Sequence, residues 1–178
     1  MEKLPGMAAT VSSSAEQLLD GLFSSGGLFL SQVCTVTGIE PHTVQNWVKR
    51  GFVPPPEQKT YSKKQLCRIA TINMLRDVLP LDTALNLLRY VNGVLDDESD
   101  DRIDDSLLYL KFCRLTYASA DSIADSIANV TADIEDAEVR ERTATVLEGM
   151  YYAYRSAEYK KKAEGLIASA LKKGEIAL

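Results

Sequence analysis

The sequence has few of the residues that build metal centres and catalytic sites: one histidine and three cysteines in 178 residues. Cys34, Cys67 and Cys113 are odd in number, far apart and set in apolar helical patterns. We expect buried free thiols in a reducing cytoplasm, with a cysteine-based metal or redox sensor as the alternative. His42 has no serine or cysteine beside it in a nucleophile motif, so we do not expect it to be a catalytic base.

Long apolar runs, phosphate-binding loops and paired acid–base motifs are also missing. No run approaches the roughly 18 apolar residues that cross a membrane, and we expect no secretory signal. The 46% hydrophobic residues are nevertheless enough for a packed core. The sequence therefore predicts a cytoplasmic protein that is not an enzyme, has no cofactor or metal and does not associate with membranes.

Acidic residues are scarce in one segment and abundant in another. Residues 41–76 contain seven Lys and Arg against Glu57 alone, whereas residues 96–178 contain 11 Lys and Arg against 18 Asp and Glu. The net charge of the chain is -5. A basic segment joined to an acidic body is typical of a nucleic-acid-binding face. A charged, solvated surface is the alternative.

Residues 37–54 have the pattern of a helix-turn-helix. Gly38 falls where a first helix ends and the chain turns through a left-handed conformation. Pro41 then presets the first turn of a second helix, expected over about residues 41–50. The first segment, residues 30–37, fits a helix or a strand by periodicity alone, and its place before Gly38 favours a helix.

The expected second helix is amphipathic. Val44, Trp47 and Val48 fall at i, i+3 and i+4 and give one apolar face to pack on the first helix. Stacking of Trp47 on a nucleic-acid base is the alternative to its place in the core. Hydrogen-bonding side chains that suit base edges and phosphates occupy the opposite face: His42, Thr43, Gln45, Asn46 and Lys49.

Each polar side chain has an expected role. Gln45 and Asn46 are amides that can pair bidentately with adenine, each contact contributing about 1–3 kcal/mol of discrimination. His42 suits a phosphate contact or has no role. The side chains best suited to phosphates, which fix register without reading sequence, are Thr43, Lys49, Arg50, Lys59, Tyr61, Lys63 and Lys64. The alternative is a solvated polar face, with Arg50 capping the helix end and Tyr61 packed beneath the wing.

Helices are expected on both sides of this motif. Capping boxes that begin at Ser14 and Ser62 predict a helix over about residues 15–24 and another directly after Ser62. Residues 54–56 are three prolines, which prevent helix and fix an extended backbone typical of a wing. A further helix is expected over about residues 81–92.

The acidic residues 96–105 predict a solvated linker, because a calcium loop would need a glycine at its sixth place and a carboxylate at its twelfth. Asp104 and Asp105 are expected to cap the helix that follows. Two further helices are expected around residues 123–128 and 135–173. On the last one, side chains at 4-3 spacing predict helix-on-helix packing and a dimer: Val139, Thr143, Val146, Met150 and Ala153.

Together these patterns predict an all-α protein with a minimal β wing. Four segments are expected: a flexible N-terminus (1–14), a winged helix-turn-helix DNA-binding domain (15–95), an acidic linker (96–105) and a C-terminal helical region (106–178). The last segment would form a helical bundle and supply dimerisation or sensing.

The order of elements over about residues 30–93 resembles the N-terminal domain of MerR-type regulators. This order is helix, turn, second helix, proline-bounded wing and two more helices. The matching motifs are Thr37-Gly38-Ile39, Thr43-Val44 and Lys49-Arg50-Gly51-Phe52-Val53-Pro54. The resemblance implies a winged fold that binds DNA. The wing lacks the arginine that those proteins usually place before its tyrosine, and the segment after residue 106 differs from their single dimerising helix with effector cysteines.

A fuller stretch resembles an uncharacterised bacterial family, domain of unknown function 1836. The resemblance covers about residues 30–117 and implies a MerR-like regulator without an established activity. The segments that match are Asn46-Trp47-Val48-Lys49-Arg50-Gly51, Tyr61-Ser62-Lys63-Lys64-Gln65-Leu66 and Tyr90-Val91-Asn92-Gly93 through Asp104-Asp105.

We therefore expect a homodimeric transcription regulator that inserts the helix around residues 41–50 into the major groove of double-stranded DNA. Its C-terminal region would dimerise or bind an unidentified effector. The alternative is a protein–protein interaction module that keeps the helix-turn-helix as a scaffold. Such a module does not need the basic face between residues 41 and 64.

Overall fold

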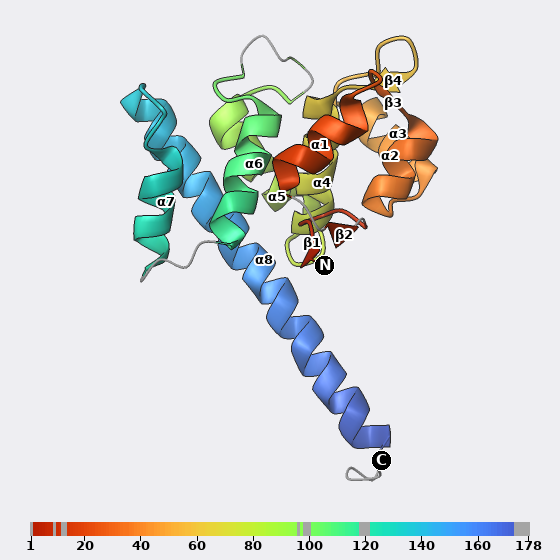
Figure 1. The fold of residues 1–178 in the computed structure, drawn as a ribbon, viewed down its shortest axis with the longest axis vertical. Helices are drawn as coiled ribbons and strands as arrows, with labels where there is room; N and C mark the ends of the chain where they lie inside the picture. Colours follow the sequence, from red (N-terminus) through yellow and green to blue (C-terminus); the bar gives the residue numbers. More distant parts are fainter. Residues whose placement is uncertain are drawn as a thin grey trace.

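The chain folds into packed helices with two very small antiparallel sheets, as a computed structural model that describes residues 2–8, 10–11, 14–95, 97, 101–117 and 122–172 shows (Figure 1). The predicted all-α class with a minimal β wing is confirmed. The elements are β1 (Glu2–Lys3), β2 (Thr10–Val11), α1 (Ala15–Phe23), β3 (Leu28–Phe29), α2 (Leu30–Thr37), α3 (Pro41–Lys49), β4 (Thr60–Tyr61), α4 (Lys63–Leu75), α5 (Leu81–Asn92), α6 (Asp105–Thr116), α7 (Ile123–Thr131) and α8 (Ala137–Lys172).

The helices begin where side chains can accept the free backbone N–H groups of a first turn. Ser14 and Ser62 each form a complete capping box, with Gln17 and Gln65 as their partners. Asp104 caps α6 by accepting hydrogen bonds from the N–H groups of the second and third residues after it. The sequence patterns therefore located these three starts correctly.

Residues 4–8, within the segment predicted as a flexible N-terminus, pack against the helices. Leu4 and Met7 are 2% and 1% exposed and belong to the core. The Tyr109 hydroxyl donates to the Pro5 carbonyl at 2.7 Å. β1 pairs with β2, so the segment turns back on itself and lies against the helices. Residues 1, 9 and 12–13 lie outside the described part of the chain.

Gly6 sits where this segment crosses α4. Its φ of 69° lies in the left-handed region, and a Cβ built on it would come within 1.9 Å of the Ala70 carbonyl oxygen. The Gly6 carbonyl accepts a hydrogen bond from Asn73 Nδ2 at 3.0 Å. Only glycine allows both the backbone conformation and this close approach.

Replacing Gly6 by alanine should lower the free energy of unfolding by about 3 kcal/mol, since strain at positive φ and overpacking against α4 add together. Urea unfolding followed by circular dichroism measures this. Gly165→Ala is the matched control: nothing lies within 4 Å of its Cβ position, and the change should stabilise α8 by up to about 1 kcal/mol. Equal stability of the Gly6→Ala protein and the wild type would contradict the assigned contact.

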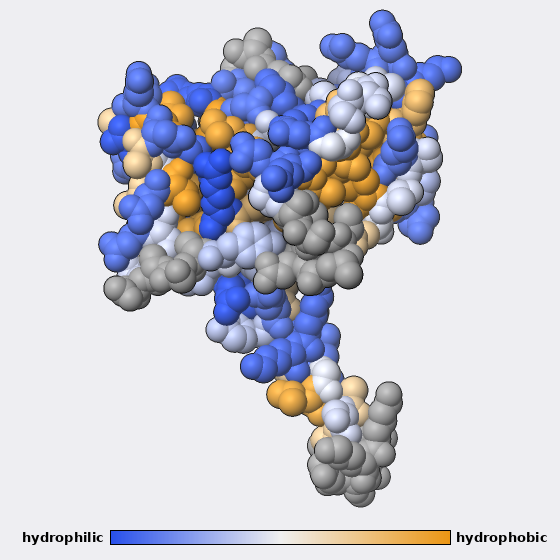
Figure 2. Space-filling model, in the orientation of Figure 1, coloured by the Kyte–Doolittle hydropathy of each residue, from blue (hydrophilic) through white to orange (hydrophobic). Residues whose placement is uncertain are grey.

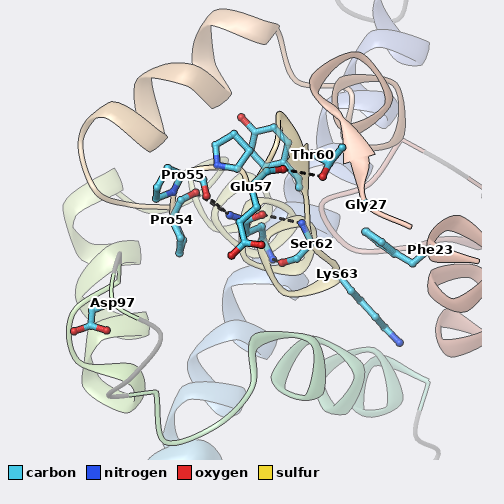
Figure 3. A pocket seen from close by; sticks show the side chains of 12 residues that line it. Phe23, Gly27, Pro54, Pro55, Glu57, Thr60, Ser62, Lys63 and Asp97 are labelled. Atoms are coloured by element: carbon cyan, nitrogen blue, oxygen red, sulfur yellow. Dashed lines mark hydrogen bonds between the residues drawn. The ribbon is translucent and has the colours of Figure 1, made fainter. Parts of the chain in front are cut away.

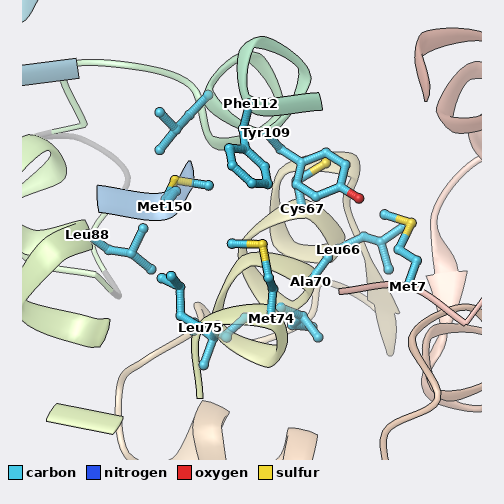
Figure 4. Close-up of a cluster of buried hydrophobic side chains, with 14 of the residues drawn as sticks. Met7, Leu66, Cys67, Ala70, Met74, Leu75, Leu88, Tyr109, Phe112 and Met150 are labelled. Carbon is cyan, nitrogen blue, oxygen red and sulfur yellow. The ribbon is translucent and has the colours of Figure 1, made fainter. Parts of the chain in front are cut away.

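Helix α4 forms the centre of the fold, with α2, α5, α6 and α8 packed around it. Leu66, Cys67 and Ile72 are fully buried, and they point in different directions around the helix axis. A helix that is apolar on all sides is a buried helix. Figure 4 shows α4 side chains in contact with side chains from the N-terminal segment, α5, α6 and α8.

The helices before and after the acidic segment share this core. α6 packs on α4, and α8 packs on α4, α5, α6 and α7. Phe112 of α6 meets Tyr154 of α8 edge to face, with ring centroids 5.9 Å apart. The division into separate units at residues 95 and 106 stays a prediction.

The 4-3 stripe on α8 is used inside the chain. Thr143, Val146, Met150 and Ala153 are buried against the neighbouring helices, and Val139 is half-buried. The predicted helix-on-helix packing is therefore found within one chain, and these side chains are not available to a second copy. The homodimer itself stays a prediction.

Arg68 lies on α4 with 1% of its side chain exposed, so it does not belong to the basic surface. Its Nε is 2.6 Å from Oδ2 of Asp105 and its Nη2 is 3.2 Å from Oδ1 of Asp101. Nη1 donates to the Leu95 carbonyl. Asp105, which the sequence suggested as a helix cap, is instead the buried partner of Arg68.

The amide of Asn92 holds the same acidic segment from the other side. Its Nδ2 donates to the Ile103 carbonyl at 2.9 Å, and the Ile103 N–H donates to Asn92 Oδ1 at 3.2 Å. The structure describes residues 97 and 101–105 of the predicted linker. Within this part, residues 101–105 are held to α4 by Arg68 and to α5 by Asn92. Residues 96 and 98–100 lie outside the described part.

Burial raises the pKa of Asp105 from 3.8 to about 6, although the positive charge of Arg68 opposes the shift. The folded state holds this proton more tightly than the unfolded state, so stability should fall as pH rises from about 4 to about 6 and then level off. Urea unfolding at several pH values would measure the slope. Asp105→Asn should flatten it, whereas Asp82→Asn on the exposed face of α5 should keep it. An unchanged slope in the Asp105→Asn protein would contradict the assignment.

Candidate nucleic-acid interface

α2 and α3 are joined by a tight turn at Gly38. Its φ is 72° and its N–H donates to the Cys34 carbonyl at 2.8 Å, which closes α2. α3 then starts with Pro41 in its first turn. The chain therefore turns between the two helices where the sequence predicted.

The end of α3 is closed by two backbone hydrogen bonds of the Schellman type. The Phe52 N–H donates to the Trp47 carbonyl at 2.9 Å, and the Gly51 N–H donates to the Val48 carbonyl at 3.1 Å. Gly51 has a φ of 69° and supplies the left-handed residue that this motif needs. The chain then leaves α3 toward the prolines of the wing.

The two faces of α3 divide as predicted. Val44 and Trp47 are 0% and 2% exposed, and Val48 is half-buried. A ring buried to this extent cannot stack on a base, so Trp47 is a core residue. The Arg76 guanidinium lies 5.2 Å from the centroid of its ring. On the outer face His42, Gln45, Asn46 and Lys49 are exposed and Thr43 is half-buried.

A tight turn and a very small antiparallel sheet form the wing beside α3. β3 pairs antiparallel with β4, with Leu28 opposite Tyr61 and Phe29 opposite Thr60. At the tip Glu57 bridges to Thr60, and the two residues between them have φ values of 46° and 69°. Two consecutive left-handed residues are typical of a tight hairpin turn. They place Lys59 at the exposed tip of the wing.

Gln65 anchors the base of the wing. Its Nε2 donates to the carbonyls of Pro54 and Pro55, both at 3.0 Å, while its Oε1 accepts from the Ser62 N–H at 2.7 Å. The wing borders an open cavity of about 810 Å³ whose walls include Phe23, the prolines and the start of α4 (Figure 3). The capping residue of α4 thus also fixes the proline segment that carries the wing.

Three of the predicted cationic contacts are exposed and lack an ion pair with any described residue: Lys49, Arg50 and Lys59. The Arg50 guanidinium lies 4.4 Å from the centroid of the Phe52 ring. This contact orients the side chain beyond the end of α3 without neutralising its charge. The positive charge available to an anion is therefore concentrated at the end of α3 and at the wing tip.

Two other predicted lysines already have acidic partners. Lys63 Nζ is 2.8 Å from Asp20 Oδ1, and Lys64 Nζ is 3.1 Å from Asp104 Oδ2. A phosphate would have to compete with these carboxylates. Lys63 and Lys64 are accordingly weaker candidates than Lys49 and Lys59.

Tyr61, also predicted as a phosphate contact, lies beneath the wing instead. It is 3% exposed and belongs to the core, and burial raises its pKa. The packing alternative considered from the sequence is therefore the one found. Conversely, Arg76 was counted in the basic segment but given no role. It is exposed, and its contact with Trp47 places a further cation against α3.

Residues 25–112 match the model of a protein family described as Domain of unknown function (DUF1836). The match spans β3 to most of α6 and confirms that part of the resemblance. No curated protein and no solved structure matches the chain. Among the described residues, no helix has the length and apolar character needed to cross a membrane.

Proposed function

We propose that the domain of unknown function in this chain binds double-stranded DNA and that the protein is a transcription regulator. In this proposal α3 enters the major groove and the wing lies along the adjacent backbone. The observation that supports it most directly is the outer face of α3. Exposed amides and a lysine lie there opposite the buried Val44 and Trp47. Two cations follow, Arg50 and Lys59, which form no ion pair with a described residue.

The roles of the side chains follow from their chemistry. Gln45 and Asn46 are suited to base edges because an amide can donate to and accept from adenine at once. Lys49, Arg50 and Lys59 are suited to phosphates, together with His42 and Thr43 at the start of α3. Lys63 and Lys64 would contribute less, since carboxylates partly neutralise them.

The order of elements supports the MerR-like part of the proposal. A short strand precedes the helix-turn-helix and pairs with the strand after the wing tip, and two helices follow. Apart from the first strand, which the sequence did not predict, this is the order that the sequence resemblance implied. The acidic body is then expected to face away from the phosphates, which would repel it.

Two copies of α3 would make the binding specific. One recognition helix covers only a few base pairs, whereas two copies about one helical turn apart read a site long enough for regulation. The proposed partners are therefore duplex DNA and a second copy of the chain.

Lys49→Ala and Lys59→Ala should each weaken DNA binding by a similar factor on all sequences and reduce the slope of log K against log salt by about 1. Fluorescence anisotropy with mixed genomic fragments at low and moderate salt measures both. Lys162→Ala, an equal charge change on the exposed C-terminal half of α8, is the control and should bind like the wild type. Folded wild-type protein that does not bind at low salt would exclude the proposal and favour a protein-interaction module.

Gln45→Ala and Asn46→Ala should relax sequence preference, each lowering the discrimination between the preferred site and random DNA by about 1–3 kcal/mol. Selection of bound genomic fragments by each variant, followed by competition titrations, gives this difference. Binding to random DNA should change little, because its phosphate contacts are intact. A uniform loss on all sequences would assign these amides to the backbone.

A further inference from the structure

The C-terminal half of α8 extends away from the body of the protein (Figure 1). Ala153 is the last buried residue of the helix, and residues 159–169 are all exposed. Helices without tertiary contacts are marginal in water, because most helical stability comes from packing of an apolar face. The extension therefore needs a covering surface.

This extension has an apolar stripe. Tyr159, Leu166 and Ile167 are 63%, 65% and 55% exposed, and Leu171 is 39% exposed. Hydrophobic surface is visible near the end of the extension in Figure 2. The residues that recur at spacings of four or three along this side of α8 are Thr145, Gly149, Tyr152, Ser156, Tyr159, Ala163, Ile167 and Ala170. Such spacing is that of a helix-pairing seam.

At its upper end the stripe borders a groove between α5 and α8. The groove has a volume of about 590 Å³ and none of its lining side chains is charged. Leu87 and Tyr90 of α5 form one wall, and Gly149 and Tyr152 of α8 form the other. A Cβ on Gly149 would lie 3.4 Å from the methyl groups of Leu87, so the glycine lets α8 pack closely against α5 at this point. The uncharged, largely apolar lining of the groove suits an apolar occupant.

We propose that two copies of this chain pair through antiparallel α8 helices, and that the apolar end of each extension fills the α5–α8 groove of the other copy. A two-fold axis between Tyr159 and Lys160 would place Tyr152 opposite the partner's Ile167 and Gly149 opposite the partner's Ala170. Ile167 lies about five turns beyond Gly149, on the same face of the helix. The partner's Ile167 and Leu171 therefore meet the groove.

The available area agrees with a dimer. If a fully exposed large side chain offers about 200 Å², then the five half-exposed ones, Tyr152, Tyr159, Leu166, Ile167 and Leu171, offer on the order of 500 Å² per copy. Two copies would bury about 1,000 Å² from these residues alone, which reaches the size of a specific interface.

A second copy fits better than other occupants because the groove and the apolar end lie on one seam of the same helix. Two-fold symmetry covers both surfaces in both copies and closes the assembly. A flat lipid surface would cover the extension but could not enter a groove walled by α5. This pairing supplies the dimer used in the proposed function, but it involves none of the proposed DNA contacts.

Light scattering after size exclusion should give twice the chain mass of 19.6 kDa. Ile167→Asp and Leu171→Asp should each raise the dimer dissociation constant about 100-fold, because a charge enters an apolar contact. Ser169→Asp is the matched control, since Ser169 is exposed on the same extension but off the seam, and it should stay dimeric. Gly149→Leu should fill the groove and favour the monomer while α8 keeps its helicity.

A mixing experiment tests the register. Protein with Ser156→Cys and protein with Ala163→Cys should form a mixed crosslinked dimer with a short bismaleimide, in higher yield than either protein alone. A monomeric wild type, equal behaviour of Ile167→Asp and Ser169→Asp, or a monomer that binds phosphatidylcholine–phosphatidylserine vesicles through Ile167 would overturn the pairing. The Lys49→Ala titration is independent of these results, so failure of the dimer and failure of DNA binding are distinguishable.

Discussion

The fold depends on a buried cation at the centre of its central helix. Arg68 projects from α4 into a site formed by Asp101, Asp105 and the Leu95 carbonyl. Removing one partner of such a pair costs about 3–5 kcal/mol, because the remaining charge stays buried without compensation. A guanidinium with this many partners accepts few arrangements. Arg68 thereby fixes the path of the chain between the end of α5 and the start of α6.

A second buried cation extends the same arrangement outward. Lys111 on α6 is 1% exposed, donates to the Val130 carbonyl at 2.8 Å and pairs with Asp133 at the end of α7. Arg68 thus joins α6 to α4, and Lys111 joins α7 to α6. Both cations are buried and paired with carboxylates, so neither adds to the exposed positive charge near α3 and the wing.

The candidate DNA-binding face is therefore smaller than the basic segment of the sequence. Arg68 is buried, Lys63 and Lys64 face carboxylates, and Tyr61 lies in the core. The charges that are left stand at the end of α3 and the tip of the wing. Gln65 fixes the segment between the end of α3 and the wing, because it holds the prolines after α3 to the start of α4. The amino-acid composition of the segment shows how many cations it has. The packing of the chain determines which of them stay exposed.

Helix α8 has two different apolar sides. Val146 and Met150 face the bundle and are fully buried, whereas Gly149 and Tyr152 face outward at the groove beside α5. The first side holds the chain together. The second continues along the extension, where no described part of the chain covers it. One side of α8 therefore stabilises the fold of a single chain, and the other side is available for pairing with a second copy.

The local features of the fold could be predicted from the sequence alone. These features depend only on neighbouring residues, so the local spacing of residue types reveals them. They are the capping boxes at Ser14 and Ser62, the left-handed Gly38, Pro41 at the start of α3 and the buried side of α3. Three features became clear from the folded chain: the partners of Arg68 and Asp105, the burial of Leu4 and Met7, and the stripe of α8 that stays exposed. These depend on contacts between segments far apart in the chain, and a periodic pattern shows that a face is apolar without showing what covers it.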